Sequence, residues 1–307
     1  MSVVLGITAG ASPRGSADIL LTEALRAAEE AGCAVRLVRV DDLDLRSGPA
    51  AASGPDDAGW FWEQLLEADA LIVSTPIYSR TVPGALRLLG DKISGPQADV
   101  AFTEELLRLR ASGSDIAVDF PVDERVLRPR VAGFIAVGGS LPDRWKTLAL
   151  PLMHTLTASM QIAVVDQVVF AGAGGPSSVV LDDAALARAA SLGREVAAQA
   201  GAAYDDATYR GAPGVCPLCH LDVVVIRADG IECATCGAAG ELVVEDGRVR
   251  AVFPEAGRSQ SVLTLAEKRD HFAEVQETAA RQRPLAEAIR ERAAPYATLL
   301  PRLRPPN

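Results

Sequence analysis

Four cysteines in two closely spaced pairs constrain the fold of this chain more than any other feature of its sequence. Cys216 and Cys219 form the first pair, Cys233 and Cys236 form the second, and 13 residues lie between the two pairs. Each pair can present two thiolates from a tight turn to one tetrahedral metal ion, and a short hairpin can span the interval. The sequence therefore predicts a closed, structural four-thiolate site, with Zn²⁺ as the leading candidate.

Two other uses of these cysteines are weighed against zinc. Two disulfides are one alternative, and iron of the rubredoxin type is the other. Disulfides are disfavoured because the cysteine usage suits a reducing compartment, where disulfides are rare. The fifth cysteine, Cys33, stands in an apolar stretch, and no signal segment precedes the first predicted strand. No apolar run reaches the roughly 18 residues that a membrane helix needs. We therefore expect a soluble, cytoplasmic protein with no membrane association.

The overall charge excludes one class of partner. The chain has 307 residues, a formal net charge of −10 and a 49% hydrophobic composition. Nonspecific binding of nucleic acid needs clustered Lys and Arg to neutralise phosphates, so no nucleic-acid partner is expected. The length exceeds that of most single domains, so we expect a large module followed by the cysteine module.

The N-terminal part of the sequence alternates strand and helix patterns. The predicted strands are 3–8, 35–40, 71–75, 131–137 and 163–170, and the predicted helices are 16–31, 59–68, 82–93, 147–160 and 182–200. Such alternation is typical of a parallel sheet with helices on both faces. The interval 94–130 is longer than an ordinary connection. It is either a lid or subunit contact, or a surface excursion.

The loop after the first predicted strand has the side chains of a phosphate site. Ser12, Arg14 and Ser16 offer two hydroxyls and a guanidinium beside the free N–H groups of a helix start. The alternative is that Ser16 only caps the helix while Arg14 is solvated. The glycine patterns of dinucleotide and P-loop sites are absent from this loop. Asp41, where a Rossmann domain would bind ribose, is therefore interpreted as part of a solvated turn.

The loop after the third predicted strand can border a planar ligand. Pro76 fixes a bend, and Tyr78 offers a flat face with a polar tip. A third loop, Gly138-Gly139-Ser140, follows the fourth strand and lets backbone amides approach a ligand closely.

The first two loops together resemble those of the NAD(P)H-dependent FMN reductase family. In that family a serine-x-arginine-x-x-serine loop follows strand one. Ser12 and Arg14 match that loop, and Ser16 stands one place earlier than the family's second serine.

The second loop of the family reads proline-x-tyrosine-asparagine-glycine-serine, followed by a proline-glycine-alanine-leucine helix start. This chain keeps the proline, the tyrosine and the helix start, but it replaces the three residues after the tyrosine by Ser79, Arg80 and Thr81. Some flavodoxin-like relatives also carry an iron–sulfur cluster in an insertion after the third-strand helix. The interval 94–130 contains no cysteine, so that cluster is not expected here.

The resemblance covers about residues 1–200 and implies a flavodoxin-like, doubly wound five-stranded parallel sheet that binds FMN. By this resemblance the cofactor-binding residues are Ser12, Arg14, Ser16, Pro76, Ile77, Tyr78, Gly138, Gly139 and Ser140. Arg80, at the mouth of the site, is a candidate for binding substrate, either a dinucleotide phosphate or an anionic acceptor. No protein side chain is expected to be catalytic, because the flavin carries the chemistry.

These expectations define a function and its alternatives. The leading hypothesis is an FMN-dependent oxidoreductase that takes hydride from NADPH or NADH. It would reduce a small-molecule acceptor such as a quinone, nitro, azo or other conjugated compound, or supply reduced flavin. A homodimer or higher homo-oligomer is expected. The alternatives are a non-enzymatic adaptor that binds a protein through its zinc ribbon, and a Rossmann-type dehydrogenase.

Three domains are predicted. They are a flavodoxin-like FMN-binding domain over 1–203 with an insertion at about 94–130, a small β zinc ribbon over 212–254 and a charged C-terminal helical segment over 263–295. We expect the last segment to pack across the body or a neighbouring subunit.

Overall fold

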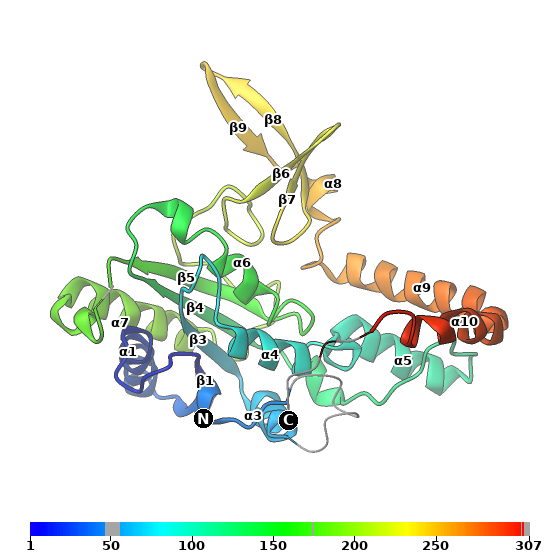
Figure 1. Cartoon of the computed structure of the whole chain (residues 1–307). Helices are drawn as coiled ribbons and strands as arrows, with labels where there is room; N and C mark the ends of the chain where they lie inside the picture. The colour runs from blue at the N-terminus through cyan, green and yellow to red at the C-terminus, as the bar shows by residue number, and fades with distance from the viewer. Residues whose placement is uncertain (47–55, 174, 302, 304–307) are drawn as a thin grey trace.

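A computed structural model describes residues 1–46, 56–173, 175–301 and 303 (Figure 1). The body is a five-stranded parallel sheet in the order β2-β1-β3-β4-β5. Its strands are β1 (Val3–Thr8), β2 (Ala34–Arg39), β3 (Ala70–Pro76), β4 (Val131–Gly138) and β5 (Ala163–Ala171). This is the flavodoxin order, so the predicted fold class is confirmed. The order differs from that of a Rossmann domain and gives the dehydrogenase alternative no support.

Helices cover both faces of this sheet, which is why β4 is buried along its whole length. One face carries α1 (Ser16–Glu30) and α7 (Asp183–Ala198), and the other carries α3 (Ala58–Glu67), α4 (Gly84–Ile93) and α6 (Ala149–His154). The two helices of the first face approach closely at Gly193. A Cβ there would lie 1.9 Å from the backbone oxygen of Ala24.

The helix predicted over 147–160 is shorter than expected. Only Ala149–His154 is α-helical, and turns continue to Gln161, whose φ is +53°. Thr155 Oγ1 donates to the Leu152 carbonyl at 2.7 Å, and Thr157 Oγ1 donates to the His154 carbonyl at 3.3 Å. Hydroxyls that bond nearby backbone carbonyls compete with a regular helix, which explains the early end.

The predicted insertion provides a surface on which the C-terminal segment docks. It contains α5 (Val100–Ser112), which lies alongside α9 (Leu265–Gln282) (Figure 1). Phe102 and Phe272 meet edge to face with ring centroids 5.0 Å apart, and both are buried. The C-terminal segment packs on the body, one of the two arrangements predicted for it.

The C-terminal segment is not one continuous helix. A 3₁₀ turn at Arg283–Leu285 separates α9 from α10 (Ala286–Ala293), because Pro284 has no N–H to continue the helix. Within the described residues, further short 3₁₀ segments lie at Val40–Asp42, Pro96–Ala98, Glu124–Leu127, Asp143–Trp145, Ser178–Leu181 and Ala294–Ala297.

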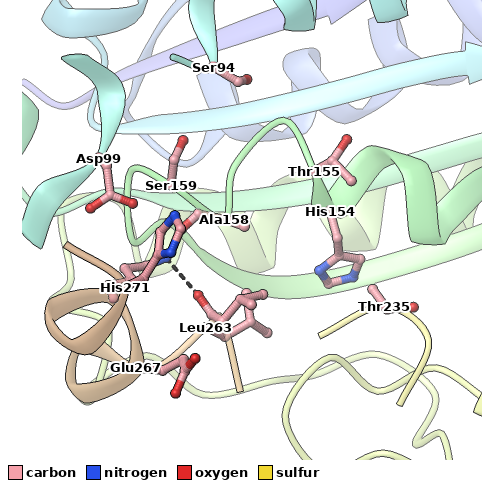
Figure 2. Close-up of a pocket in the computed structure, with 12 residues that line it drawn as sticks. Ser94, Asp99, His154, Thr155, Ala158, Ser159, Thr235, Leu263, Glu267 and His271 are labelled. Carbon is pink, nitrogen blue, oxygen red and sulfur yellow. Dashed lines mark hydrogen bonds between the residues drawn. The ribbon is translucent and has the colours of Figure 1, made fainter. Parts of the chain in front are cut away.

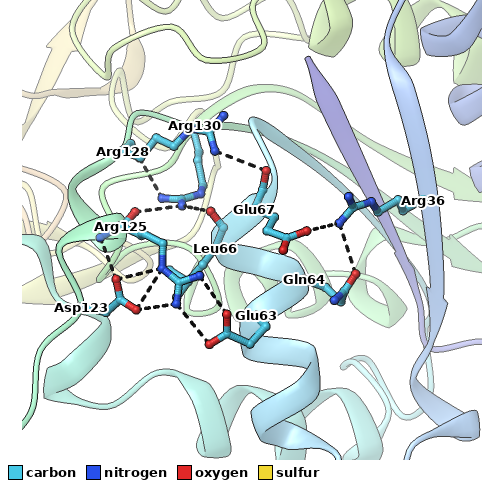
Figure 3. Close-up of polar contacts among 9 residues, drawn as sticks. All are labelled: Arg36, Glu63, Gln64, Leu66, Glu67, Asp123, Arg125, Arg128 and Arg130. Atoms are coloured by element: carbon cyan, nitrogen blue, oxygen red, sulfur yellow. Dashed lines mark hydrogen bonds and ion pairs between the residues drawn. The ribbon is translucent and has the colours of Figure 1, made fainter. Parts of the chain in front are cut away.

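Two arginines fasten the end of the insertion to α3 (Figure 3). Arg130 is buried, and its guanidinium donates to the carbonyls of Leu66 at 2.8 Å and Ala68 at 3.1 Å. Burial lowers the pKa of Arg130 to about 10, so it stays charged at neutral pH. Arg125 pairs with Asp123 and Glu63. The carbonyls at the carboxyl end of α3 thus gain a cationic partner.

The cysteine module is a four-stranded antiparallel sheet that projects from the body (Figure 1). Its elements are β6 (Val224–Arg227), β7 (Gly230–Cys233), β8 (Ala239–Glu245), β9 (Arg248–Val252) and the short helix α8 (Glu255–Arg258). Its buried residues form one cluster with those on the α3 and α4 face of the body. No helix within the described residues is both long and apolar enough to cross a membrane.

Candidate functional site

A cavity of about 310 Å³ opens at the carboxyl ends of β1, β3 and β4. The three predicted loops meet there, in the region where a flavodoxin-like sheet binds its ligand. The lining includes six of the predicted cofactor residues, namely Ser12, Ser16, Pro76, Ile77, Tyr78 and Gly139. Gly138 lies next to Ile77, whose Cδ1 would be 3.3 Å from a Cβ on Gly138. The lining omits Arg14, Ser140 and Arg80.

The first loop ends in an open helix start. Gly15 is the N-cap of α1, without a side-chain cap, and Ser16 is the first helical residue. Ser16 Oγ is buried and has no hydrogen-bond partner among the described residues. Ser16 therefore does not cap the helix, which was the alternative to a phosphate contact. A buried hydroxyl beside free N–H groups at the positive end of a helix fits an anionic group such as phosphate.

A buried polar cluster shapes this loop, and the sequence patterns did not reveal it. Thr8 Oγ1 donates to Asp18 at 3.2 Å and accepts from the backbone N–H of Gly10 at 3.1 Å. Arg39 pairs with Asp18 and donates to the Gly10 carbonyl at 2.9 Å. The arginine thus offsets an acid in the first turn of α1, which would otherwise oppose an anion there. A Cβ on Gly10 would lie 2.2 Å from Asp18 Oδ2, so a larger residue there would displace the Asp18 carboxylate from this cluster.

The second loop forms a tight turn beside the cavity. Backbone hydrogen bonds join Tyr78 and Thr81 in both directions, at 2.9 and 3.0 Å. The two central residues, Ser79 and Arg80, have φ values of +48° and +76°. Positive φ at both positions is the geometry for which Asn-Gly is preferred, so Ser-Arg here is strained. The turn leaves Arg80 exposed at its tip and the Tyr78 side chain 52% exposed.

The third loop is joined by a fourth that we did not predict. The backbone N–H of Ile77 donates to the Val137 carbonyl at 2.8 Å and so joins the ends of β3 and β4. Gly175 and Pro176, which follow β5, also line the cavity. Ser177 Oγ then donates to the Arg14 carbonyl at 2.5 Å and links the fourth loop to the first. A glycine and a proline after the fifth strand were the sequence signal that could have revealed this loop.

The four predicted metal ligands lie together. Their ligand atoms are within 4.8 Å of one another, and all four cysteines are buried. Cys216 Sγ is 3.5 Å from Cys236 Sγ, and Cys219 Sγ is 3.4 Å from Cys233 Sγ. Four Zn–S bonds of 2.3 Å would place tetrahedral sulfurs about 3.8 Å apart, whereas a disulfide needs about 2 Å. The donor set therefore fits one tetrahedral metal ion, and the disulfide alternative is wrong.

The two cysteine turns have matching backbone geometry. The N–H of His220 donates to the Cys216 carbonyl, and the N–H of Gly237 donates to the Cys233 carbonyl, both at 2.9 Å. Each donor has positive φ, +57° for His220 and +74° for Gly237. His220 thus takes the position that glycine holds in the second turn, and it stacks on Tyr209 with centroids 3.6 Å apart.

A buried pair of side chains, Gln167 and His154, connects the first cysteine turn to the sheet. Gln167 on β5 donates through Nε2 to the Cys219 carbonyl at 2.8 Å, which leaves its Oε1 to accept from His154 Nε2 at 2.9 Å. Burial lowers the pKa of His154 to about 4, so its ring is neutral at pH 7. His154 therefore makes a buried, uncharged contact between α6 and β5.

Comparison with known proteins defines the class of this protein. The family model described as NADPH-dependent FMN reductase matches residues 2–175, more than half of the chain. The chain therefore belongs to the NADPH-dependent FMN reductase family and is an FMN-dependent oxidoreductase that uses NAD(P)H.

Three individual relatives align with this chain over different lengths. Flavone synthase cfoJ of Aspergillus candidus is 34% identical over 293 residues, which are 89% of this chain and 88% of that protein. A structure described as flavone reductase is 27% identical, has a TM-score of 0.83 and aligns over 99% of this chain and 100% of its own. Iron-sulfur flavoprotein MJ1083 of Methanocaldococcus jannaschii is 26% identical over 63% of this chain and 95% of that protein. The flavone reductase match spans the cysteine module and the C-terminal helices as well as the body.

Proposed function

We propose that the protein is an NAD(P)H oxidoreductase whose acceptor is a planar conjugated molecule of the flavone class. The observation that supports its cofactor site most directly is Ser16 Oγ, buried without a partner at the uncapped start of α1. Bound in this cavity, FMN would supply hydride chemistry between NAD(P)H and the acceptor.

The chain's own residues hold and orient the reactants. Ser16, Ser12 and the first N–H groups of α1 bind the phosphate, with Arg14 offering charge from the exposed side of the loop. Pro76, Ile77 and Tyr78 border the ring system. The backbone of Gly138, Gly139 and Ser140 approaches its polar edge, because glycines leave the amides accessible.

The acceptor class rests on the rim of the cavity and on the two relatives whose names refer to flavones. Tyr78 is half exposed there, and Leu141, two residues after the lining residue Gly139, is 72% exposed. The Leu141 side chain lies 3.2 Å from the position of a Cβ on Gly172, beside the fourth loop. Exposed aromatic and apolar side chains around a flavin site favour a flat apolar acceptor over a small charged one.

The cofactor proposal is tested by FMN titration of the apoprotein, followed through quenching of flavin fluorescence. Ser16→Ala should weaken FMN binding about tenfold or more, since a hydrogen bond to a charged group is lost. Thr22→Ala on the same helix is the control, because that hydroxyl already bonds the Asp18 carbonyl and lies outside the cavity lining. Protein that elutes colourless from gel filtration after incubation with excess FMN would overturn the proposal.

The acceptor proposal is tested by anaerobic turnover of NADPH with a flavone, followed by mass spectrometry. We expect a product two hydrogens heavier than the flavone. Consumption of NADPH with a quinone but none with the flavone would contradict the acceptor class and leave the FMN site intact.

We also propose that the four cysteines hold Zn²⁺ in a structural role. All four coordination positions of the ion are then filled by thiolates, with none open to substrate. Elemental analysis should give one zinc per chain. One iron per chain, with the visible absorbance of iron–thiolate bonds, would favour the rubredoxin-type alternative.

A homo-oligomer is the remaining part of the proposal. The stretch 285–300, which begins in the C-terminal segment and continues past it, exposes Leu285, Ile289, Leu299 and Leu300, each by about half or more of its surface. Apolar side chains gathered on one segment are typical of an interface. Light scattering coupled to gel filtration should give twice the 32.1 kDa chain mass or a higher multiple, and a monomer at micromolar concentration would contradict it.

A further inference from the structure

A second cavity, of about 390 Å³, lies where the body, the cysteine module and α9 meet (Figure 2). Ser94 follows α4 and Ser159 precedes β5, so this cavity is near the amino ends of the strands. Thr235 contributes from the second cysteine turn, and His271 contributes from α9. The cavity shares none of its described lining residues with the flavin cavity at the opposite edge of the sheet.

Three hydroxyls in this lining have no partner in the described part of the chain. They are Ser94 Oγ, Ser159 Oγ and Thr235 Oγ1, and each atom is buried. Buried polar atoms are rarely left without a hydrogen bond, because the lost contact with water is then not replaced. Three such hydroxyls on one cavity, from separate segments, indicate that something polar binds between them.

The charges around the cavity disfavour an anionic ligand. Asp99 caps α5 by accepting from the backbone N–H groups of Ala101 and Phe102, both through Oδ1. Its other oxygen makes no hydrogen bond within the described chain. Lys268 is 5% exposed and donates to the carbonyls of Val262, at 2.7 Å, and Ala158. The ammonium offsets one carboxylate and Glu267 adds a second to the same lining, so a ligand that brings negative charge is disfavoured.

The two ends of the cavity both accept hydrogen bonds. Figure 2 shows Asp99 and His271 at one end, His154 and Thr235 at the other, and Ala158 and Leu263 between them. His154 donates through Nε2 to Gln167, so the neutral ring keeps Nδ1 as an acceptor. A ligand that donates at both ends and is apolar in the middle matches this arrangement.

We propose that this cavity is a second binding site, separate from the flavin site, for an uncharged phenolic molecule with hydroxyl groups at both ends of an aromatic body. One hydroxyl donates to the Asp99 carboxylate and the other to His154 Nδ1. The serine and threonine hydroxyls complete the contacts. The volume suits a two-ring molecule.

The test uses 4,4′-dihydroxybiphenyl as the probe and isothermal titration of the FMN-loaded protein. We expect saturable binding, and we expect 4-hydroxybiphenyl, which lacks one hydroxyl, to bind about fivefold more weakly. Equal affinity for the two probes would overturn the proposed recognition. The absence of binding by either probe would show that the three hydroxyls hold only water.

A double variant, Ser159→Ala with Thr235→Val, locates the bound probe. Both hydroxyls lack protein partners, so the variant should melt at or above the wild-type temperature while binding the probe about tenfold more weakly. Tyr78→Ala, at the flavin cavity, is the matched comparison and should bind the probe as the wild type does. Unchanged affinity in the double variant, or loss of probe binding in Tyr78→Ala, would place the probe elsewhere and overturn the proposal.

Discussion

The body and the cysteine module are both built around sheets, yet different interactions stabilise them. All eight residues of β4 are buried between two layers of helices. In β9, four of the five residues are exposed and none is fully buried. The module's buried core consists of the four cysteines and a few apolar side chains such as Ile231 and Phe253. The body therefore depends on buried apolar surface, whereas the module, with few buried side chains, needs the metal proposed for its four cysteines, as small domains commonly do.

The buried cores of the two regions are nevertheless continuous. The buried cysteines belong to the same apolar cluster as the α3 and α4 face of the sheet. Gln167 bonds the Cys219 carbonyl, and Ser261 Oγ bonds the Cys236 carbonyl at 2.8 Å. The two regions thus differ in what stabilises them but share a contact surface. Experiments can test whether one region can unfold while the other stays folded.

Removal of the metal should have the largest effect. Because structural zinc supplies on the order of 10 kcal/mol of binding free energy to its domain, Cys233→Ser or strong chelation should unfold the module. Hydrogen exchange followed by mass spectrometry should show loss of protection over 216–253. Protection of β4 and FMN binding should persist. Exchange that rises equally in β4 would show that the body also depends on the metal.

Two glycines offer a matched test of packing in each region. A Cβ on Gly193 would lie 1.9 Å from the Ala24 oxygen, and one on Gly257 would lie 2.0 Å from the Ala239 oxygen. Gly193→Ala should lower the unfolding free energy of the body by about 3 kcal/mol through overpacking. Gly257→Ala should disturb only the module. Urea denaturation followed by flavin fluorescence should report the first and not the second, and equal shifts would contradict the contrast.

Acid should destabilise the contact between the regions through His154. Its folded-state pKa is lowered to about 4 by burial, below an unfolded value near 6.5. The unfolded chain therefore binds a proton first, and stability falls as pH drops from about 6.5 to 4, by about 3 kcal/mol in all. His154→Gln should show a shallower decline in unfolding free energy over this range. Parallel declines for the two proteins would refute this role of His154.

The strained turn at Ser79 and Arg80 should give the smallest effect. Replacing the pair with Asn-Gly should raise stability by about 0.5–1 kcal/mol, because both residues have positive φ. If Arg80 contacts the dinucleotide phosphate, the same change should raise the KM for NADPH a few-fold more than that for NADH. Arg80→Lys keeps the charge and should retain most of the preference. An unchanged ratio of the two KM values would exclude this role.

The convergence of the predicted loops on one cavity could be foreseen because its signals are local. Ser12, Ser16, Pro76 and Tyr78 follow strands whose apolar runs are unmistakable, and parallel strands bring their carboxyl ends to one edge. The pairing of Asp18 with Arg39 could not be predicted, because 21 residues separate them and only the adjacency of β1 and β2 brings them together.

By itself the sequence determined the parallel α/β body, the loops that end its strands and the pairing of four cysteines as candidate metal ligands. These follow from hydrophobic periodicity and from spacings of a few residues, which act within one segment of chain. Only the tertiary structure decided that α9 packs against α5 of the insertion. It also decided that the body, α9 and the cysteine module enclose a second cavity. Those features depend on side chains distant in sequence, whose positions are fixed only when the whole core packs.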